Sequence, residues 1–203
     1  GSEMCIRDRA SMRPFLPTGI CSLCALLAFY PAPALVAAEP DNTDLAGEAS
    51  KLAQQFVGQL KPQLKQAMAA GGPTNAIKVC ADVAPNIADA LSDQSGWLVK
   101  RVSLKSRNAS RAVPDKWEQA VLAEFDRRQA AGAAPADLHF GEVTGGQYRY
   151  MQAQGVEPLC LVCHGRELDD AVQLTLEQYY PDDWATGYQL GQVRGAISLS
   201  KPL

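Results

Sequence analysis

A CxxCH run at residues 160–164 constrains the fold of this chain more than any other feature of its sequence. This spacing is the attachment signature of a c-type haem. The thiols of Cys160 and Cys163 would reach the two vinyl groups of one porphyrin edge, and His164 could bind the iron. A zinc site would require a second ligand pair, and His139 is the only other histidine. A thioredoxin-like dithiol or an incidental pattern is the remaining alternative.

The late position of this motif argues against the ordinary helical cytochrome c fold. In small electron-transfer cytochromes the attachment site usually lies near the mature N-terminus, and a downstream methionine supplies the sixth iron ligand. Here the residues after His164 include no methionine, histidine or cysteine. A strong sixth ligand must therefore come from upstream. The candidates there are Cys80, His139, Met68 and Met151, and lysines are less favoured.

Cys80 has two possible roles. It lies on the apolar stripe of an expected helix, where a lone cysteine is most often a small core residue. It is also the only cysteine left unpaired once Cys160 and Cys163 form thioethers and the signal peptide is removed. An exported protein seldom keeps a free thiol without a use for it. Coordination to ferric iron, which favours the thiolate, would explain its retention.

The N-terminus is expected to be removed before the protein functions. Residues 1–11 precede a plausible start methionine and are interpreted as a non-native leader. Residues 12–38 combine an early arginine, an apolar run and small residues up to Ala38, which is typical of a secretory signal peptide. Residues 39–44 are expected to be a linker, and residues 45–203 a single c-type haem domain.

Export agrees with the motif, because bacteria attach c-type haem outside the cytoplasm. We therefore expect a periplasmic protein. No later stretch approaches the roughly 20 apolar residues that a membrane-spanning helix needs, so the mature chain is expected to be soluble. About 165 residues remain after cleavage, enough for one domain with a real core. They carry 16 basic against 20 acidic side chains, from totals of 19 and 22, and form no long basic run. A nucleic-acid partner is therefore not expected.

Apolar periodicity predicts helices first and strands later, which makes an α+β domain with an antiparallel sheet. One helix begins at Leu45 and should be kinked or interrupted at Pro62. A second follows the glycine pair at residues 71–72, with Thr74 as a possible N-cap, and a third opens at Pro114. The expected strands are Trp97–Leu104, the hairpin Leu138–Val143 with Gln147–Met151, and an edge or central strand, Val193–Ser200. On the hairpin, Tyr148 and Tyr150 alternate with Arg149, so one set should pack in the core and the other face water.

Several motifs in order extend the pattern beyond CxxCH, namely Asn75–Cys80, Trp97–Asn108, Pro114–Glu118, Cys160–Gly165 and Tyr188–Ser198. Together they resemble a family of bacterial exported single-haem c-type proteins of unassigned function, which have a PAS-like α+β fold. Members occur alone and as the extracytoplasmic sensor part of signalling receptors. The resemblance covers essentially the whole expected mature chain.

The resemblance implies one haem c held by Cys160 and Cys163, with His164 and Cys80 as the two axial iron ligands. An anionic thiolate ligand stabilises ferric iron, so the reduction potential should be low. The resemblance also implies that Arg101 and Arg107 are partners for the haem propionates. For each arginine, the alternative is a solvated surface charge.

The Arg194-Gly195 pair has two interpretations. It could close over the haem, because glycine permits close approach of the backbone to the ring. The alternative is a bend in a strand.

Three functional classes follow from these observations. The first is a redox or gas-responsive haem sensor that acts through an unknown redox or signalling partner. The second is a low-potential periplasmic electron-transfer cytochrome. The third, a peroxidase, would need an open iron site and a distal acid or base, and His139 is the only histidine left for that role. We therefore expect a haem protein that is not an enzyme.

Overall fold

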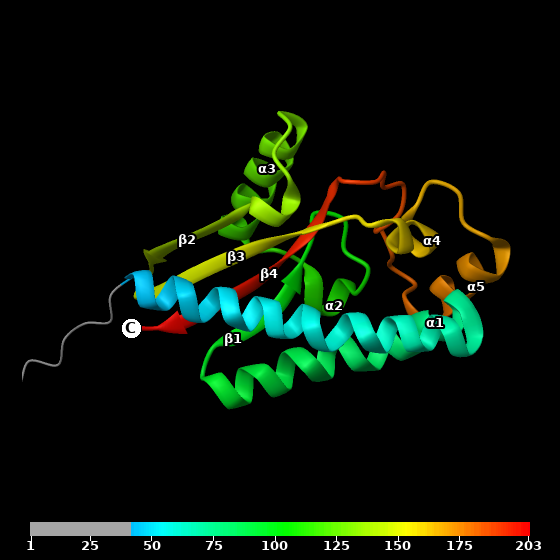
Figure 1. Ribbon diagram of the computed structural model, residues 1–203, viewed down its shortest axis with the longest axis horizontal. Coiled ribbons are helices and arrows are strands. Elements are labelled where there is room, and N and C mark those ends of the chain that lie inside the picture. The colour runs from blue at the N-terminus through cyan, green and yellow to red at the C-terminus, as the bar shows by residue number, and fades with distance from the viewer. Residues whose placement is uncertain (1–41) are drawn as a thin grey trace, which may run out of the picture. The chain divides into compact units, whose positions relative to one another are not determined.

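Two long helices open the described part of the chain, which covers residues 42–203 of a computed structural model. They are the two halves of α1 (Asn42–Ser95), whose backbone leaves the helical conformation at Gly71 and Gly72. Gly72 has φ +68°, a left-handed value that favours glycine. The helix continues through Pro62, so the interruption predicted there does not occur. The two halves run side by side after this reversal (Figure 1).

The reversal is closed by residues on either side of the glycines. Pro73 is the first helical residue of the second half, where its missing N–H leaves no intrahelical bond unmade. Thr74 therefore lies inside the helix and is not its N-cap. The side-chain amide of Asn75 donates to the carbonyl oxygen of Ala67 at 2.9 Å, which ties the start of the second half to the end of the first.

The N-terminal predictions fall largely outside the described residues. The leader, the signal peptide and the first part of the linker 39–44 all precede Asn42. α1 begins at Asn42, so the last predicted linker residues are helical. The described residues belong to one compact unit, and none of their helices is long and apolar enough to cross a membrane.

A four-stranded antiparallel sheet forms the centre of the domain. Its order is β1 (Leu98–Val102), β4 (Val193–Pro202), β3 (Gln147–Gly155) and β2 (His139–Thr144). β4 is a central strand because it pairs with both β1 and β3. β2 and β3 form the predicted hairpin, whose two turn glycines have φ of +61° and +74°, as a type I′ turn requires.

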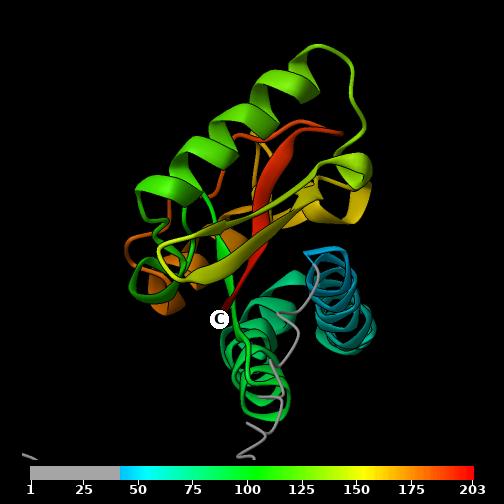
Figure 2. The same cartoon turned by 90° about the vertical axis from the view of Figure 1, so that its left-hand side faces the viewer.

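Helices cover both faces of this sheet. α1 lies against one face, and α3 (Lys116–Ala130) lies against the other (Figures 1 and 2). α3 begins as predicted, with Asp115 as the N-cap of a capping box completed by Glu118. The shorter helices are α2 (Ala109–Ala112), α4 (Leu161–His164) and α5 (Asp170–Tyr179), with 3-10 turns η1 (Pro135–Asp137) and η2 (Pro158–Cys160).

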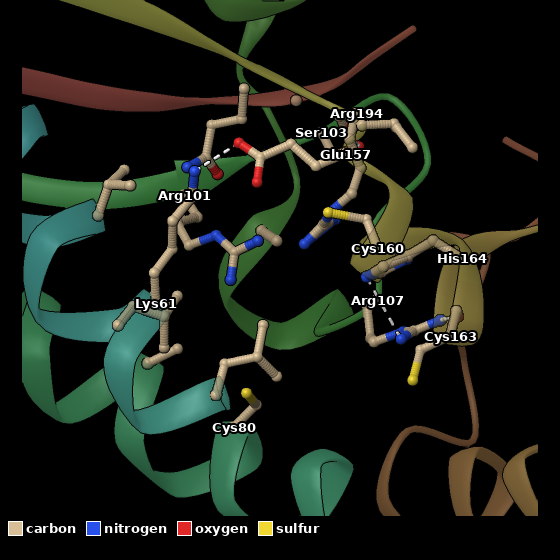
Figure 3. Close-up of a pocket in the computed structure, with 18 of the residues that line it drawn as sticks. Lys61, Cys80, Arg101, Ser103, Arg107, Glu157, Cys160, Cys163, His164 and Arg194 are labelled. Carbon is tan, nitrogen blue, oxygen red and sulfur yellow. Dashed lines mark hydrogen bonds and ion pairs between the residues drawn. The ribbon is translucent and has the colours of Figure 1, made fainter. Parts of the chain in front are cut away.

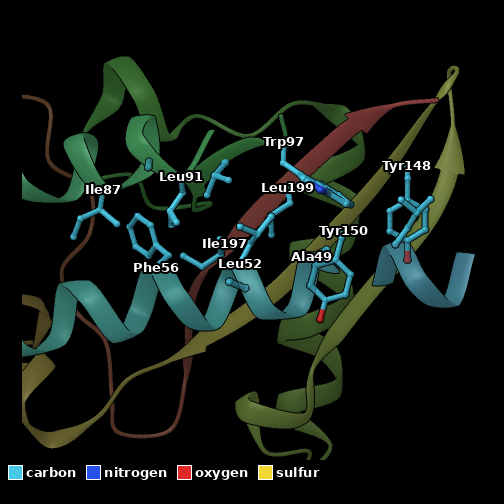
Figure 4. Packing of buried hydrophobic residues seen from close by; sticks show 14 of the residues in the cluster. Ala49, Leu52, Phe56, Ile87, Leu91, Trp97, Tyr148, Tyr150, Ile197 and Leu199 are labelled. Atoms are coloured by element: carbon cyan, nitrogen blue, oxygen red, sulfur yellow. The ribbon is translucent and has the colours of Figure 1, made fainter. Parts of the chain in front are cut away.

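Each face of the sheet has its own hydrophobic core. Between α1 and the sheet, Phe56 and Ile197 are fully buried, and Trp97 packs edge-on against Tyr148 with ring centroids 6.1 Å apart (Figure 4). The cluster under α3 contains these residues: Val102, Val121, Leu122, Phe125, Leu138, Met151, Ala153, Val193 and Ala196. Burying one such large apolar side chain contributes about 1.5–3 kcal/mol.

The two covered faces explain why Arg149 does not face water as the hairpin pattern predicted. Tyr148 and Tyr150 are buried on the α1 side, as expected. Arg149 points to the α3 side, where its guanidinium lies 4.2 Å from the Trp117 ring centroid and pairs with Asp115 at 2.7 Å. The α+β, PAS-like architecture, with an antiparallel sheet flanked by N-terminal helices, is confirmed.

Candidate functional site

A cavity of about 570 Å³ lies between α1, β1, the start of β4 and the segment that carries the CxxCH motif. This volume falls within the range of roughly 300–1,000 Å³ that is usual for cofactor and small-molecule sites. The cavity brings together every site residue predicted from the sequence, namely Cys80, Arg101, Arg107, Cys160, Cys163 and His164. Figure 3 shows Cys80 on the α1 side and the CxxCH residues on the opposite side.

The CxxCH residues share one face because the motif forms a single helical turn. Cys160 ends η2, and α4 continues through His164. Cys163 and His164 follow Cys160 by three and four positions, a spacing that places side chains together on a helix. The turn ends at Gly165, whose N–H donates to the carbonyl oxygen of Leu161 at 2.9 Å. Neither cysteine is in a disulfide.

His164 is held in one orientation and one tautomer. Its Nδ1 lies 2.6 Å from the carbonyl oxygen of Ala185, which can only accept, so Nδ1 carries the proton. Nε2 therefore keeps its lone pair, and only a long contact of 3.4 Å joins it to Arg107 Nη1. Burial lowers the pKa of His164 well below its usual value, and the nearby cations Arg194 and Arg107 lower it further. A neutral imidazole fixed through Nδ1 is the form that metal-binding histidines use.

Arg107 and Asp183 hold this arrangement together. Asp183 accepts from Arg107 Nε at 3.1 Å and from the Ala185 N–H at 2.8 Å. Arg107 Nη2 also donates to the carbonyl oxygen of Cys163 at 2.5 Å. The side chains are only 11% and 8% exposed, so little solvent screens the pair. The ion pair thus joins the motif to the loop that orients His164.

This network adds a residue that the sequence analysis missed. Asp183 lies in a stretch without apolar periodicity, and nothing in its local sequence marks it as a partner of Arg107. The prediction that Arg107 meets a propionate stays a prediction. Its guanidinium already has a carboxylate partner in Asp183.

The candidates for a sixth ligand separate clearly in space. Cys80 and Met68 line the cavity. His139 lies on the edge strand β2, where it stacks on Tyr150 with ring centroids 6.1 Å apart, and Met151 is fully buried under α3. Burial raises the pKa of the Cys80 thiol, while the nearby arginines act in the opposite direction.

Arg101 and Arg194 line the same cavity, and neither has a carboxylate at ion-pair distance among residues 42–203. Arg101 has one aromatic contact, 6.0 Å from the Phe56 ring centroid. Burial, together with the repulsion of Arg101 and Arg107, lowers the pKa of Arg194 to about 9. The two guanidinium groups are therefore half-buried with no carboxylate of the described residues to compensate their charge.

The surroundings of Gly195 decide between the two interpretations of the Arg194-Gly195 pair. A Cβ at this position would collide with the carbonyl oxygen of Val102 on β1, and φ is +156°. The close approach that needs glycine is therefore one between strands, which agrees with the strand-bend interpretation. Among residues 42–203, no group of three or more His, Cys, Asp or Glu side chains could hold a metal ion.

Comparison with known proteins agrees with this architecture. A solved structure, that of the cyanobacterial heme-protein Tll0287, matches with a TM-score of 0.58 at 24% sequence identity, covering 81% of this chain and 97% of that one. At this identity the similarity shows the fold. No curated protein sequence matches the chain significantly. The family model described as Tll0287-like matches residues 34–202, which is most of the sequence. The chain therefore belongs to the Tll0287-like family, as the resemblance to single-haem c-type proteins predicted.

Proposed function

We propose that this chain is an exported periplasmic protein that binds one haem c covalently and serves as a redox or gas-responsive sensor module acting through a protein partner. The observation that carries the proposal is the fixed tautomer of His164, whose Nδ1 is bound to the Ala185 carbonyl while Nε2 keeps its lone pair and has only the 3.4 Å contact with Arg107. The structural neighbour is described as a heme-protein, which supports the same cofactor.

The residues of the cavity fit a haem in three independent ways. Cys160 and Cys163 are free thiols on one helical turn, as thioether formation requires. The imidazole of His164 is neutral and adjoins them. Arg101 and Arg194, which have no carboxylate at ion-pair distance within the described part of the chain, supply charge for an anionic group. A haem held there would supply one-electron chemistry and, if one axial bond opened, a site for a small gaseous ligand.

The chain would do the positioning. Ala185 and the ion pair of Arg107 with Asp183 fix the imidazole, and for iron binding Arg107 has to give up only its 3.4 Å contact with Nε2. Cys80 is the proposed second axial ligand because its thiol lines the cavity on the side opposite His164. Ferric iron would offset the penalty that burial places on the thiolate form of Cys80.

The location of Cys80 supports a sensing role. It lies in the second half of α1, whose later residues Ala84, Ile87 and Leu91 pack in the core against the sheet. Loss of a bond at Cys80 would therefore act on a helix that leads directly into β1. A low-potential electron-transfer cytochrome is the alternative, and it would keep the bond at Cys80 in both oxidation states.

The first experiment compares ferric and ferrous absorption and EPR spectra of the holoprotein with those of two variants. We expect a low-spin ferric haem with thiolate character in the wild type. Cys80→Ala should abolish that character, and Met68→Leu should leave it intact, because only the thiol is expected to bind. Unchanged spectra in Cys80→Ala would contradict the assignment, and a changed spectrum in Met68→Leu would transfer it to the thioether.

Covalent attachment and sensing are tested separately. The double variant Cys160→Ala with Cys163→Ala should lose all haem under denaturing conditions, and retained haem would disprove the attachment site. Carbon monoxide binding to the ferrous wild type would favour a displaceable ligand and hence sensing. A ferrous form inert to carbon monoxide would favour electron transfer.

A further inference from the structure

The position of Arg194 breaks the alternation of β4. Along a regular strand, successive side chains point to opposite faces of the sheet. Ala196 packs under α3, and the Ser198 hydroxyl donates to Glu118 of α3 at 2.5 Å. Ile197 and Leu199 pack on the α1 side. A regular strand would therefore point Arg194 toward α3, away from the cavity.

A β-bulge reverses this direction. In the pairing of β3 with β4, Gln154 lies opposite Gly195 but Gly155 lies opposite Val193, so Arg194 is an extra residue without a partner. Val193 is back in the core under α3, three residues before Ala196. Arg194 consequently faces the cavity. Bulges that turn a side chain in this way are common next to functional sites.

The bulge is anchored on both sides. Gly195 permits it, because φ is +156° and any Cβ would collide with the carbonyl oxygen of Val102. The Arg194 carbonyl oxygen accepts hydrogen bonds from the hydroxyls of Ser103 at 2.6 Å and Tyr188 at 3.2 Å. The orientation of Arg194 is thus set by its neighbours and not by a flexible loop.

The result is a pair of cations facing one cavity. Arg101 reaches it from β1 and Arg194 from the bulge (Figure 3). Arg107 differs from both because Asp183 neutralises it. Burying a charge is unfavourable unless an opposite charge and hydrogen bonds compensate it. A guanidinium pairs best with a carboxylate, which it binds through two parallel hydrogen bonds.

We infer that Arg101 and Arg194 together bind the two carboxylates of one ligand, and that the β-bulge supplies the second arginine of this site. The identity of the ligand rests on the proposed function: in a haem protein these carboxylates are the two propionates. Arg107 already has a carboxylate partner in Asp183, and through this pair it acts on the motif.

The test uses the holoprotein and has two readouts, the propionate bending bands in resonance Raman spectra and the reduction potential. Arg194→Gln and Arg101→Gln should each shift the propionate bands. Each should also lower the potential, since a nearby cation disfavours the ferric state. The matched control is Arg127→Gln, because Arg127 is exposed on α3 and paired with Glu124. It should leave both readouts unchanged.

Two further variants separate the effect of the Arg194 charge from the effect of the direction of its side chain. Gly195→Ala retains Arg194 but cannot keep the bulge, so it should shift the propionate bands as Arg194→Gln does. Arg194→Lys keeps the charge and loses the two-pronged contact, so it should shift the bands with a smaller change in potential. This variant also decides the question if Arg194→Gln does not accumulate.

Three outcomes would overturn the inference. The first is a wild-type Raman spectrum and potential in both Arg194 variants. The second is a response of the wild-type holoprotein to added succinate that Arg194→Gln removes, because the arginines would then serve a diffusible dicarboxylate. The third is a wild-type protein without covalent haem, which is measured first and also rejects the proposed function. Covalent haem with unaltered propionate bands in the variants rejects only the arginine site.

Discussion

Lys100 and Arg101 are neighbours on β1, yet they meet opposite electrostatic surroundings. Lys100 points toward α3 and pairs with Glu118 at 3.0 Å. Glu118 is fully buried and accepts a hydrogen bond from the Ser198 hydroxyl at 2.5 Å. Its Oε1 also lies 3.4 Å from Arg149 Nη2. Arg101 points to the cavity and has no carboxylate partner among the described residues. Lys100 therefore meets a carboxylate of its own chain, whereas Arg101 meets none among residues 42–203.

A counter-charge distinguishes a structural cation from a ligand-binding one. A buried charge that the fold itself requires arrives with its counter-charge, because an unpaired one lowers stability. A buried charge without a counter-charge makes the empty fold less stable and the bound fold more stable. The four predictions that follow test this distinction, and stability is measured by urea unfolding throughout.

The largest effect is expected at Glu118. Among residues 42–203, Glu118 is the only residue with a carboxylate at ion-pair distance from Lys100, and it also lies near Arg149. Glu118→Ala therefore removes the partner of Lys100 and part of the compensation of Arg149. Breaking such a buried network should lower the free energy of unfolding by about 3–5 kcal/mol. The loss should be the same with and without haem, since α3 lies on the other face of the sheet. A loss confined to the haem-loaded protein would erase the distinction between the two faces.

Asp183 should give the next largest effect. Asp183→Ala leaves Arg107 unpaired beside His164 and should lower stability by about 2–3 kcal/mol. The same change frees the loop at Ala185, so the ligand-field bands of the holoprotein should broaden or shift. Asp182→Ala is the control, because Asp182 is exposed. Wild-type bands in Asp183→Ala would show that the ion pair stabilises the fold without orienting the histidine.

Lys100→Met and Arg101→Met form the most direct comparison, because the same substitution is made at adjacent positions. In the haem-free Cys160→Ala/Cys163→Ala background, Lys100→Met should lower the free energy of unfolding by about 1–2 kcal/mol. Arg101→Met should change it by less than about 1 kcal/mol, in the stabilising direction, because it removes a half-buried charge that has no carboxylate partner among residues 42–203. Equal losses at the two positions would mean that Arg101 has an unrecognised partner.

The smallest effect is expected at Asp115. Burial acts to raise the pKa of Asp115, but the Glu118 N–H and Arg149 outweigh it and hold the pKa below its usual value. The ionised carboxylate therefore stabilises the fold above its unfolded pKa, and this contribution is lost as the pH falls through the folded pKa. Asp115→Ala should lower stability by about 1 kcal/mol near neutral pH. Asp115→Asn keeps an N-cap side chain, so it should lower stability by less. It should also abolish the contribution of this carboxylate to the pH dependence of stability.

The local sequence was sufficient wherever one element decides its own structure. The proline at residue 114 that precedes α3, the glycine pair at residues 71–72 and the hairpin glycines are all signals within a few residues, and each predicted its element. α5 shows where such local signals are not sufficient. Its apolar residues Val172 and Leu176 follow helical spacing, but a pattern this short does not distinguish a helix from a loop.

The face that each side chain occupies could not be predicted so well. The alternation of the hairpin predicts that Arg149 faces water. α3 covers that face of the sheet, and Arg149 pairs with Asp115 there. Pro62 was expected to interrupt a helix that continues through it. In both places neighbouring elements, far away in the sequence, decide between outcomes that the local pattern leaves open.

The linear chain specifies the α+β class, the CxxCH motif with its two thiols and histidine, and the residues among which we expect a second iron ligand. These depend on residue types and short spacings, which a linear chain already contains. Only the tertiary structure brought Cys80 to the cavity opposite His164, paired Arg107 with Asp183 and turned Arg194 beside Arg101. The physical reason is that charge pairing and strand register join residues that are remote in sequence. One extra residue in β4 is enough to move an arginine from one face of the sheet to the other.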